Sequence, residues 1–425
     1  MIEELYEVYL QFPFIETDTR EIKKNDIFFA LKGPNFNGNT FALQALELGA
    51  SYVVVDEELN SNDSRIFKVP DVLKALQALA LHHRKQFNIP FIAITGSNGK
   101  TTTKELVHAV LSSQYTTYTT YGNLNNHIGI PKTILKIKPD AEFAVIEMGA
   151  NHQKEIESYC MYALPTYGII TNCGKAHLEG FGGIDGVKKG KGELFDYLKT
   201  NNGSAFIFND YNYLINMSNG IKNIITYGNK TDAEIMGYAK PETEFLKVQF
   251  AKGISLEYIQ TNLVGDYNLP NVLCTVSVGK HFNVPDDKIK LAIENYIPEN
   301  NRSQLIQIGT NKIILDAYNA NPSSMKVAIE NFVKQPYKTK ILMLGGMMEL
   351  GNESIQEHQN IIQLVNEHNW TDVVLVGGDF EKINHPFQFF RTSLEAKEWF
   401  LKKNFNNSAF LIKGSRSTKM ELIVK

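Results

Sequence analysis

The chain has 425 residues and a formal net charge of −3, with 43% hydrophobic and 21% charged residues. This composition is ordinary for a soluble protein of two to four domains, and the acidic balance argues against a nucleic-acid binder that works by phosphate neutralisation. Cys160, Cys173 and Cys274 are too far apart for a disulfide framework or a Cys-x-x-Cys metal site, which indicates a reducing compartment. Because we find neither a signal segment nor a run of about 18 apolar residues, we expect a cytoplasmic protein without a membrane span.

Residues 1–85 are predicted to form a small α/β domain. Its expected strands are 26–31 and 51–55, and its expected helices are 41–48 and 72–87. Thr19 and Arg20 belong to an Asp-Thr-Arg stretch that could hold a phosphorylated ligand. The alternative is a solvated surface charge, which is the more common role of an isolated arginine.

Residues 91–104, FIAITGSNGKTTTK, predict a phosphate-binding loop. An apolar strand leads through two glycines into a lysine and threonines that can open a helix. Backbone N–H groups at the helix start would meet the anion, Lys100 would neutralise it, and the Thr101 hydroxyl can hold Mg²⁺. The general pattern has a glycine where this chain has Ile94, and the alternative is a chance glycine-rich turn. The expected nucleotide contacts are Gly96, Ser97, Asn98, Gly99, Lys100, Thr101 and Thr102.

Two later strands of the same unit are followed by side chains with possible chemistry. Residues 91 to 300 alternate strands with helices, which predicts a mostly parallel sheet. Strand 143–146 ends at Glu147, and strand 167–171 precedes the loop that carries His177. Because parallel strands end at one edge, we expect both residues near the phosphate loop, where Glu147 can bind Mg²⁺. A surface carboxylate and a structural histidine are the alternatives. Residues 233–258 have the alternation of antiparallel ribbons.

Residues 303–425 are predicted to form a Rossmann-like α/β domain. The expected strands are 312–315, 341–344, 373–376 and 409–412. Ser323 or Ser324 is expected to cap the helix after the first of them. No G-x-G-x-x-G follows that strand, so a dinucleotide site is not expected. The chain is therefore predicted to be an α/β protein of three domains, at 1–85, 86–302 and 303–425.

Eight stretches taken together resemble the Mur ligase family. They are TGSNGKTT at 95–102, GNLNNHIGIP at 122–131, EMGAN at 147–151, AHLEGFG at 176–182, KGELF at 191–195, DAYNANPSSM at 316–325, GGMMELG at 345–351 and KGSRSTKME at 413–421. That family uses a phosphate loop shortened in the same way. The resemblance implies an N-terminal domain for the UDP part of a substrate, a central ATPase domain, and a C-terminal domain that closes over the nucleotide.

The resemblance also implies roles for single residues. Lys191 matches a lysine that many members carry as a carbamate, an anion able to bind Mg²⁺. The implied catalytic residues are Lys100, Glu147, His177 and Lys191, and the implied metal ligands are Thr101, Glu147, His177 and Lys191. Further nucleotide contacts are implied at Asn268, Asn271, Arg302 and Asp316. Substrate contacts are implied at Thr19, Arg20, Asn125, Asn126, Asn319, Asn321, Lys413, Ser415 and Arg416. The chain departs from the usual pattern at His127, where relatives often have an acid.

The activity implied by the resemblance is ATP-dependent amide ligation in cell-wall precursor synthesis. The enzyme would phosphorylate the carboxylate of a UDP-N-acetylmuramoyl-tripeptide, and the amine of D-alanyl-D-alanine would then attack the acyl phosphate. The implied cofactors are ATP and Mg²⁺, together with carbamylation of Lys191, and a monomer that binds no nucleic acid is expected. The alternatives are a sibling ligase or folylpolyglutamate synthase that adds a single amino acid, and a regulator or transporter subunit that only hydrolyses ATP.

Overall fold

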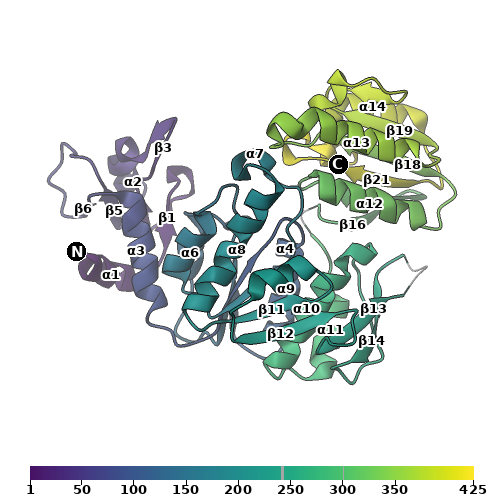
Figure 1. Ribbon diagram of the computed structural model, residues 1–425. Helices are drawn as coiled ribbons and strands as arrows, with labels where there is room; N and C mark the ends of the chain where they lie inside the picture. The colour runs from purple at the N-terminus through teal and green to yellow at the C-terminus, as the bar shows by residue number, and fades with distance from the viewer. Residues whose placement is uncertain (241–243, 300) are drawn as a thin grey trace.

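The computed structural model describes residues 1–240, 244–299 and 301–425. In these residues the strands form three main sheets, and each sheet lies within one of the ranges 1–85, 86–302 and 303–425. The N-terminal and C-terminal units lie on opposite sides of the central one (Figure 1). The predicted α/β architecture in three units is therefore confirmed, whereas the exact domain limits stay a prediction.

The N-terminal unit is a parallel sheet in the order β1-β2-β5-β6, packed against helices. Its elements are α1 (Ile2–Gln11), β1 (Ile15–Glu16), β2 (Ile27–Phe29), β3 (Lys32–Gly33), β4 (Phe36–Asn37), α2 (Ala42–Glu47), β5 (Tyr52–Val55), β6 (Ile66–Lys68) and α3 (Val72–Arg84). The Asp71 side chain caps α3 by accepting the N–H of Lys74. Because α3 packs on α1 and also on helices of the central unit, it joins the two units.

The central unit is a sheet in the order β15-β14-β13-β12-β11-β10-β7-β9-β8. Its strands are β7 (Phe91–Thr95), β8 (Thr117–Thr119), β9 (Phe143–Glu147), β10 (Tyr167–Ile170), β11 (Ser204–Phe208), β12 (Asn223–Gly228), β13 (Ile235–Ala239), β14 (Lys247–Lys252) and β15 (Tyr258–Gln260). Pairing is parallel from β8 to β13 and antiparallel at β14 and β15, which confirms the predicted ribbon. Its residues 241–243 lie outside the described part of the chain.

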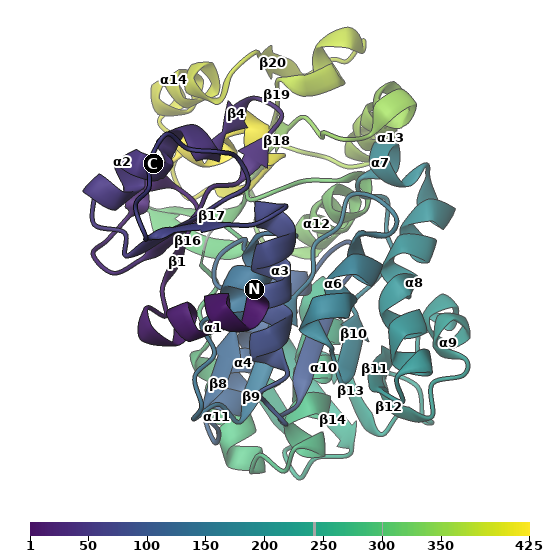
Figure 2. The ribbon, with the colours of Figure 1, turned by 90° about the vertical axis from the view of Figure 1, so that its left-hand side faces the viewer.

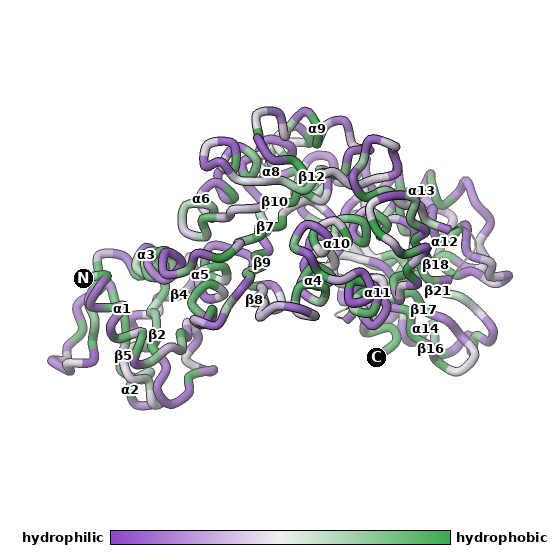
Figure 3. Tube along the Cα trace, turned by 90° about the horizontal axis from the view of Figure 1, so that it is seen from below, coloured by the Kyte–Doolittle hydropathy of each residue, from purple (hydrophilic) through white to green (hydrophobic). Residues whose placement is uncertain are grey.

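Helices cover both faces of this sheet. They are α4 (Lys100–Ser112), α5 (Gly129–Ile134), α6 (Glu155–Ala163), α7 (Leu178–Phe181), α8 (Ile184–Thr200), α9 (Asn212–Ser218), α10 (Leu269–His281) and α11 (Asp286–Asn295). α4 and α10 pack together on one face, while α8 packs with α6 on the other (Figure 2). Every residue of β7 and β9 is buried, and these strands run through the middle of the molecule in Figure 3. Burial on both faces explains their continuous apolar sequence.

The C-terminal unit is a sheet in the order β16-β17-β21-β18-β19-β20, parallel except at β16. Its elements are β16 (Gln304–Ile308), β17 (Asn311–Asp316), α12 (Pro322–Lys334), β18 (Lys340–Gly345), α13 (Ser354–Asn366), β19 (Asp372–Val376), β20 (Gln388–Phe390), α14 (Ser393–Lys403) and β21 (Ala409–Lys413). The predicted cap of α12 was wrong. Asn321 is the N-cap, because its side chain accepts the Ser324 N–H while the Ser324 hydroxyl accepts the Asn321 N–H.

In the part of the chain that the structure describes, no helix is both long enough and apolar enough to cross a bilayer.

Candidate active site

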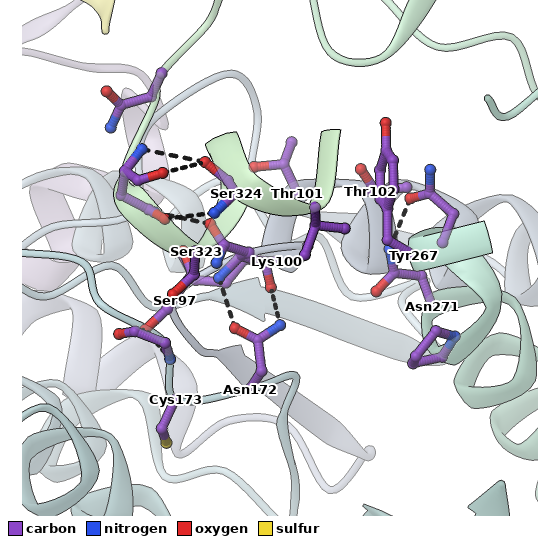
Figure 4. A pocket seen from close by; sticks show the side chains of 18 of the residues that line it. Ser97, Lys100, Thr101, Thr102, Asn172, Cys173, Tyr267, Asn271, Ser323 and Ser324 are labelled. Atoms are coloured by element: carbon purple, nitrogen blue, oxygen red, sulfur yellow. Dashed lines mark hydrogen bonds between the residues drawn. The ribbon is translucent and has the colours of Figure 1, made fainter. Parts of the chain in front are cut away.

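A cavity of about 1050 Å³ lies where the carboxyl ends of the central strands face the C-terminal unit (Figure 4). Most of the predicted site residues line it: Ser97, Asn98, Gly99, Lys100, Thr101, Thr102, Asn125, Asn126, Glu147, His177, Asn268, Asn271, Arg302, Asp316, Asn319, Asn321 and Lys413. They come from both the central and the C-terminal unit. The structure therefore brings together residues that the sequence places more than 300 positions apart.

The phosphate loop joins β7 to α4 with a backbone that suits only glycine at two points. Gly96 has φ +142°, and a Cβ there would lie 2.0 Å from the Thr171 hydroxyl oxygen. Gly99 has φ +81°, and its Cβ would lie 2.7 Å from Oδ1 of Asn271. Residues that carry a Cβ rarely adopt such φ angles, and neither position has room for a Cβ. Both glycines are therefore required for this loop shape. The loop leaves the first turn of α4 open toward the cavity.

Asn172 and Lys100 hold the loop in place. The Asn172 side chain follows β10; its Oδ1 accepts the Asn98 N–H at 3.0 Å, and its Nδ2 donates to the Asn98 carbonyl at 3.0 Å (Figure 4). The Lys100 ammonium donates to the Gly96 carbonyl at 2.6 Å. Burial lowers the pKa of Lys100, and the nearby Glu147 carboxylate partly opposes that shift. Asn172 was not predicted as a site residue, although its position just after a parallel strand was a usable signal.

Glu147 ends β9 with one carboxylate oxygen satisfied and one free. Oε1 accepts the Asn125 side-chain N–H at 2.7 Å, and the Glu147 backbone N–H donates to the Thr120 hydroxyl at 3.0 Å. Oε2 is buried and has no hydrogen-bond partner among the described residues. The whole residue is only 1% exposed. Since a buried carboxylate oxygen without a partner is costly, this atom is suited to bind a cation.

His177 stands at the start of α7, with its backbone in the left-handed region at φ +53°. It lines the cavity, and its Nδ1 contacts the carboxylate of Glu349 from the C-terminal unit. A non-glycine residue in that backbone conformation costs about 1 kcal/mol or more, which the surrounding contacts must offset.

Lys191 lies on α8, just behind the cavity wall. It is 1% exposed, its ammonium donates to the Ala150 carbonyl at 2.9 Å, and it lies 4.9 Å from the centre of the Phe181 ring. Burial, followed by the charge of Lys100, lowers the pKa of Lys191 to about 7. The amine therefore has a substantial neutral fraction at neutral pH.

The predicted metal ligands do not form a conventional cluster of protein donors. Among the described residues, no group of three or more His, Cys, Asp and Glu side chains could hold a metal ion. The predicted set instead combines a hydroxyl at Thr101, a carboxylate at Glu147, an imidazole at His177 and an amine at Lys191. Only the first three of these residues line the cavity, so the set stays a prediction.

Further polar contacts order the cavity wall beside the phosphate loop and in the C-terminal unit. Asn271 donates from Nδ2 to Oδ1 of Asn268 at 2.9 Å, so the two side chains lie together at the start of α10. The Arg302 guanidinium lies 3.6 Å from the centre of the Tyr318 ring. Asp316 accepts the Lys413 ammonium at 2.5 Å. Tyr318, Tyr211 and Tyr213 also line the cavity. None of them was predicted, because a single tyrosine, whether in a loop or on a short helix such as α9, carries no pattern of its own.

The predicted substrate residues are only partly gathered in this cavity. Asn321 donates to the Asn98 side-chain oxygen at 2.8 Å, so the start of α12 contacts the phosphate loop directly. Ser415 donates instead to the Gly346 carbonyl at 2.6 Å, and the Arg416 guanidinium lies 5.5 Å from the Tyr318 ring centre. Neither of these two residues lines the cavity.

Thr19 and Arg20 lie on the N-terminal unit, away from the main cavity. The Arg20 side chain is 84% exposed and pairs with Asp18 at 2.5 Å. A smaller cavity of about 270 Å³ lies nearby, between the N-terminal and central units, where Lys132 pairs with Glu16 at 2.9 Å. Among the described residues, Thr19 and Arg20 line neither cavity, and their substrate role stays a prediction.

Family models match the chain in three consecutive segments. The model described as Mur ligase family, catalytic domain matches residues 11–84, Mur ligase middle domain matches 94–279, and Mur ligase, glutamate ligase domain matches 301–416. Together the matches follow the order of the three sheets.

Full-length relatives give the same result. The UDP-N-acetylmuramoyl-tripeptide–D-alanyl-D-alanine ligase of Bacillus subtilis (strain 168) is 32% identical, over 97% of this chain and 92% of its own length. The enzyme of that name from Haemophilus influenzae is 34% identical, over 96% and 92%. A crystal structure of MurF from Acinetobacter baumannii matches with a TM-score of 0.87 at 29% identity, over 96% and 92%. MurF ligase from Thermotoga maritima, in complex with ADP, has the same fold, with a TM-score of 0.88 at 24% identity over 98% and 97%.

Proposed function

Because the chain belongs to the Mur ligase family, we propose that it is the ligase that joins D-alanyl-D-alanine to UDP-N-acetylmuramoyl-tripeptide in peptidoglycan precursor synthesis. The observation that carries this function is the similarity to enzymes of that activity across 97% of the chain, at 32% identity. The site geometry agrees, because a phosphate loop and an acidic strand end face a cavity shared with the C-terminal unit.

A carboxylate is a poor acyl donor, so the reaction needs its activation. The γ-phosphoryl group of ATP is transferred to the substrate carboxylate, giving an acyl phosphate and ADP. The neutral amine of the dipeptide attacks the carbonyl carbon, the C–O bond to phosphate breaks, and phosphate and a proton leave. In such phosphoryl transfers the protein contributes mainly positioning and charge neutralisation.

The chain's own residues supply both contributions. Backbone N–H groups at the start of α4 would hold the ATP phosphates, and Lys100 would neutralise their charge. Asn268, Asn271, Arg302 and Asp316, which line the same cavity, would hold the rest of the nucleotide. Asn98 and Asn321, which contact each other at 2.8 Å, would place the transferring group where the two units meet.

Mg²⁺ fits the residues present. The unpartnered Oε2 of Glu147 is a buried oxygen ligand of the kind that Mg²⁺ prefers, and the Thr101 hydroxyl lies in the same cavity. When bound, Mg²⁺ would neutralise charge on the phosphates and the substrate carboxylate. Glu147 and Thr101 would hold one ion, and Glu147, His177 and a carbamylated Lys191 would hold a second.

Carbamylation of Lys191 is supported by its burial. Only a neutral amine attacks CO₂, and the pKa of about 7 keeps much of this amine neutral at neutral pH. The product would be an anion in place of a cation, which removes the cost of a buried ammonium beside Lys100.

We propose a cytoplasmic monomer as the working form, with the UDP part of the substrate bound at the N-terminal unit near Thr19 and Arg20.

The test is a ligation assay with mass detection. Purified protein, ATP, Mg²⁺ and D-alanyl-D-alanine are incubated with UDP-N-acetylmuramoyl-tripeptides ending in meso-diaminopimelate or L-lysine, and single amino acids replace the dipeptide in parallel. We expect ADP and ligated product only when both acceptor and dipeptide are present. Product with single amino acids alone would establish the sibling ligase, and ADP formation without either substrate would establish a simple ATPase.

A further inference from the structure

The loop that carries His177 is held by the C-terminal unit at three points. We call residues 174–179 the His177 loop. The Lys175 backbone N–H donates to the Ser323 hydroxyl at 2.8 Å, and the Lys175 ammonium donates to Oε1 of Glu357 at 2.5 Å. At the other end, the Glu179 backbone N–H donates to the Glu349 carbonyl at 3.3 Å. These contacts flank His177, whose Nδ1 contacts the carboxylate of Glu349.

The C-terminal partners are themselves firmly placed. The Glu357 side chain is only 6% exposed, so its charge is buried and its ion-pair partner is supplied by another unit. The neighbouring His358 is completely buried; its Nε2 accepts the Met347 N–H at 3.0 Å, and its Nδ1 lies 2.7 Å from the Ser354 carbonyl. His358 thereby anchors the segment that carries Glu349. A rigid support on the C-terminal unit thus meets a loop of the central unit.

The His177 loop needs this support because of its backbone. His177 has φ +53°, a left-handed conformation that an isolated loop abandons unless contacts compensate for it. The amides of Lys175 and Glu179, one on each side of His177, donate to the C-terminal unit. A separation of the two units would break both hydrogen bonds and the Lys175–Glu357 ion pair together.

We propose that Glu357, acting through Lys175, and Glu349 are positioning residues that set His177 in place only when the C-terminal unit is docked. The proposal rests on the proposed function, because it assigns the role of these residues to the same site. It means that the central unit alone holds the phosphate loop and Glu147, while the C-terminal unit completes the site. Lys175 and Glu357 do not line the cavity, so their effect on the reaction would pass through the His177 loop.

A charge-reversal cycle tests the proposal. Lys175 is 45% exposed, so Lys175→Glu is compatible with folding. The substitution replaces the ion pair with two carboxylates that repel each other at the Glu357 contact. We expect Lys175→Glu and Glu357→Lys each to lower kcat about ten- to hundredfold, with KM for ATP changed less than about twofold, because a misplaced group slows the chemical step. The double variant Lys175→Glu, Glu357→Lys is expected to recover most of kcat. Glu381→Gln is the matched control, since Glu381 forms an exposed ion pair with Arg391 within the C-terminal unit.

Amide hydrogen exchange of the His177 loop gives a readout that does not depend on activity. We expect exchange at residues 174–179 to be at least about tenfold faster in Lys175→Glu, normal in the double variant, and unchanged in Glu381→Gln. Unchanged exchange and unchanged kcat in Lys175→Glu would overturn the proposal. The proposal would also be overturned if the melting temperature of Lys175→Glu fell so far that unfolding of the variant at the assay temperature explained its lower kcat. If Glu357→Lys does not fold, Lys175→Glu and Lys175→Ala decide the question. Failure of the wild type to ligate would reject the proposed function, while loop exchange would still decide the positioning role.

Discussion

Lys191 allows a quantitative prediction about its own modification. Carbamate formation requires the neutral amine, and the pKa of about 7 makes roughly half of Lys191 neutral at pH 7. A lysine with the ordinary pKa of about 10.4 is neutral in only about one molecule in 2,500 at that pH. Burial therefore favours reaction of this one amine with CO₂ by a factor of about 10³.

The pH dependence of the rate of carbamate formation distinguishes the buried amine of Lys191 from that of an ordinary exposed lysine. Between pH 6 and pH 8 the neutral fraction of a group with a pKa of 7 rises about tenfold and then levels off, whereas that of an ordinary lysine rises about a hundredfold. At fixed dissolved CO₂, the initial rate of carbamate formation at Lys191 is expected to follow the first curve. The protein is therefore first freed of CO₂, and the initial rate of carbamate formation is then measured over a series of pH values.

The assay is labelling with ¹³CO₂, rapid trapping of the carbamate by alkylation, and peptide mass spectrometry. Lys188→Ala, one turn earlier on α8 at a 41% exposed side chain, is expected to leave the labelled product unchanged, and Lys191→Ala is expected to abolish it. If the initial rate of carbamate formation rose about a hundredfold from pH 6 to pH 8 and reached no plateau by pH 8.5, Lys191 would have the pKa of an ordinary lysine, and the buried environment assigned to it would be refuted. Absence of label at every pH would refute the modification itself.

Four further outcomes are expected. Lys100→Ala should lower kcat for ligation at least about 10²-fold, because a preorganised charge at the phosphoryl centre is lost; near-normal ligation would reject its role. Gly99→Ala should abolish the rise in melting temperature caused by ATP and destabilise the protein by roughly 1 kcal/mol, since φ +81° and the 2.7 Å approach to Asn271 exclude a methyl group; intact ATP binding in calorimetry would contradict this. Glu147→Gln should lower kcat at least about 10²-fold and leave the melting temperature equal or higher, because an unpaired buried charge is removed; a large fall in melting temperature would count against the free oxygen. Protein kept free of CO₂ should become more stable from pH 7 to pH 9 in denaturant titrations, because the unfolded state, with the ordinary lysine pKa, binds more protons there than folded Lys191; stability that falls over this range would be inconsistent with the low pKa of Lys191.

Local patterns predicted the parts of the site that depend on neighbours in sequence. The loop from Gly96 to Thr101 follows from a strand, two glycines and a helix start, each visible in a few residues. Glu147 was predicted because residues at the ends of parallel strands collect at one edge of a sheet.

Contacts between units could not be predicted in this way. The Lys175–Glu357 pair joins residues 182 positions apart, and nothing near either residue marks the other. The cap of α12 was missed although it is local: a serine was favoured, whereas Asn321, directly before Pro322 at the first helical position, fills the cap. Lys191 was predicted to be a metal ligand, and that role stays a prediction; its ammonium donates to the Ala150 carbonyl and it does not line the cavity, because the direction of a side chain on α8 depends on how that helix packs.

The contact between Asn98 and Asn321 has a consequence for inhibitor design. One amide belongs to the mouth of the phosphate loop, and the other both starts α12 and crosses to that loop. A small molecule that bound Asn98 in place of Asn321 would hold the start of α12 away from the phosphate loop. Because Asn98 is also an expected nucleotide contact that lines the cavity, the same molecule would compete with ATP. One compound would thus act against both nucleotide binding and the meeting of the two units.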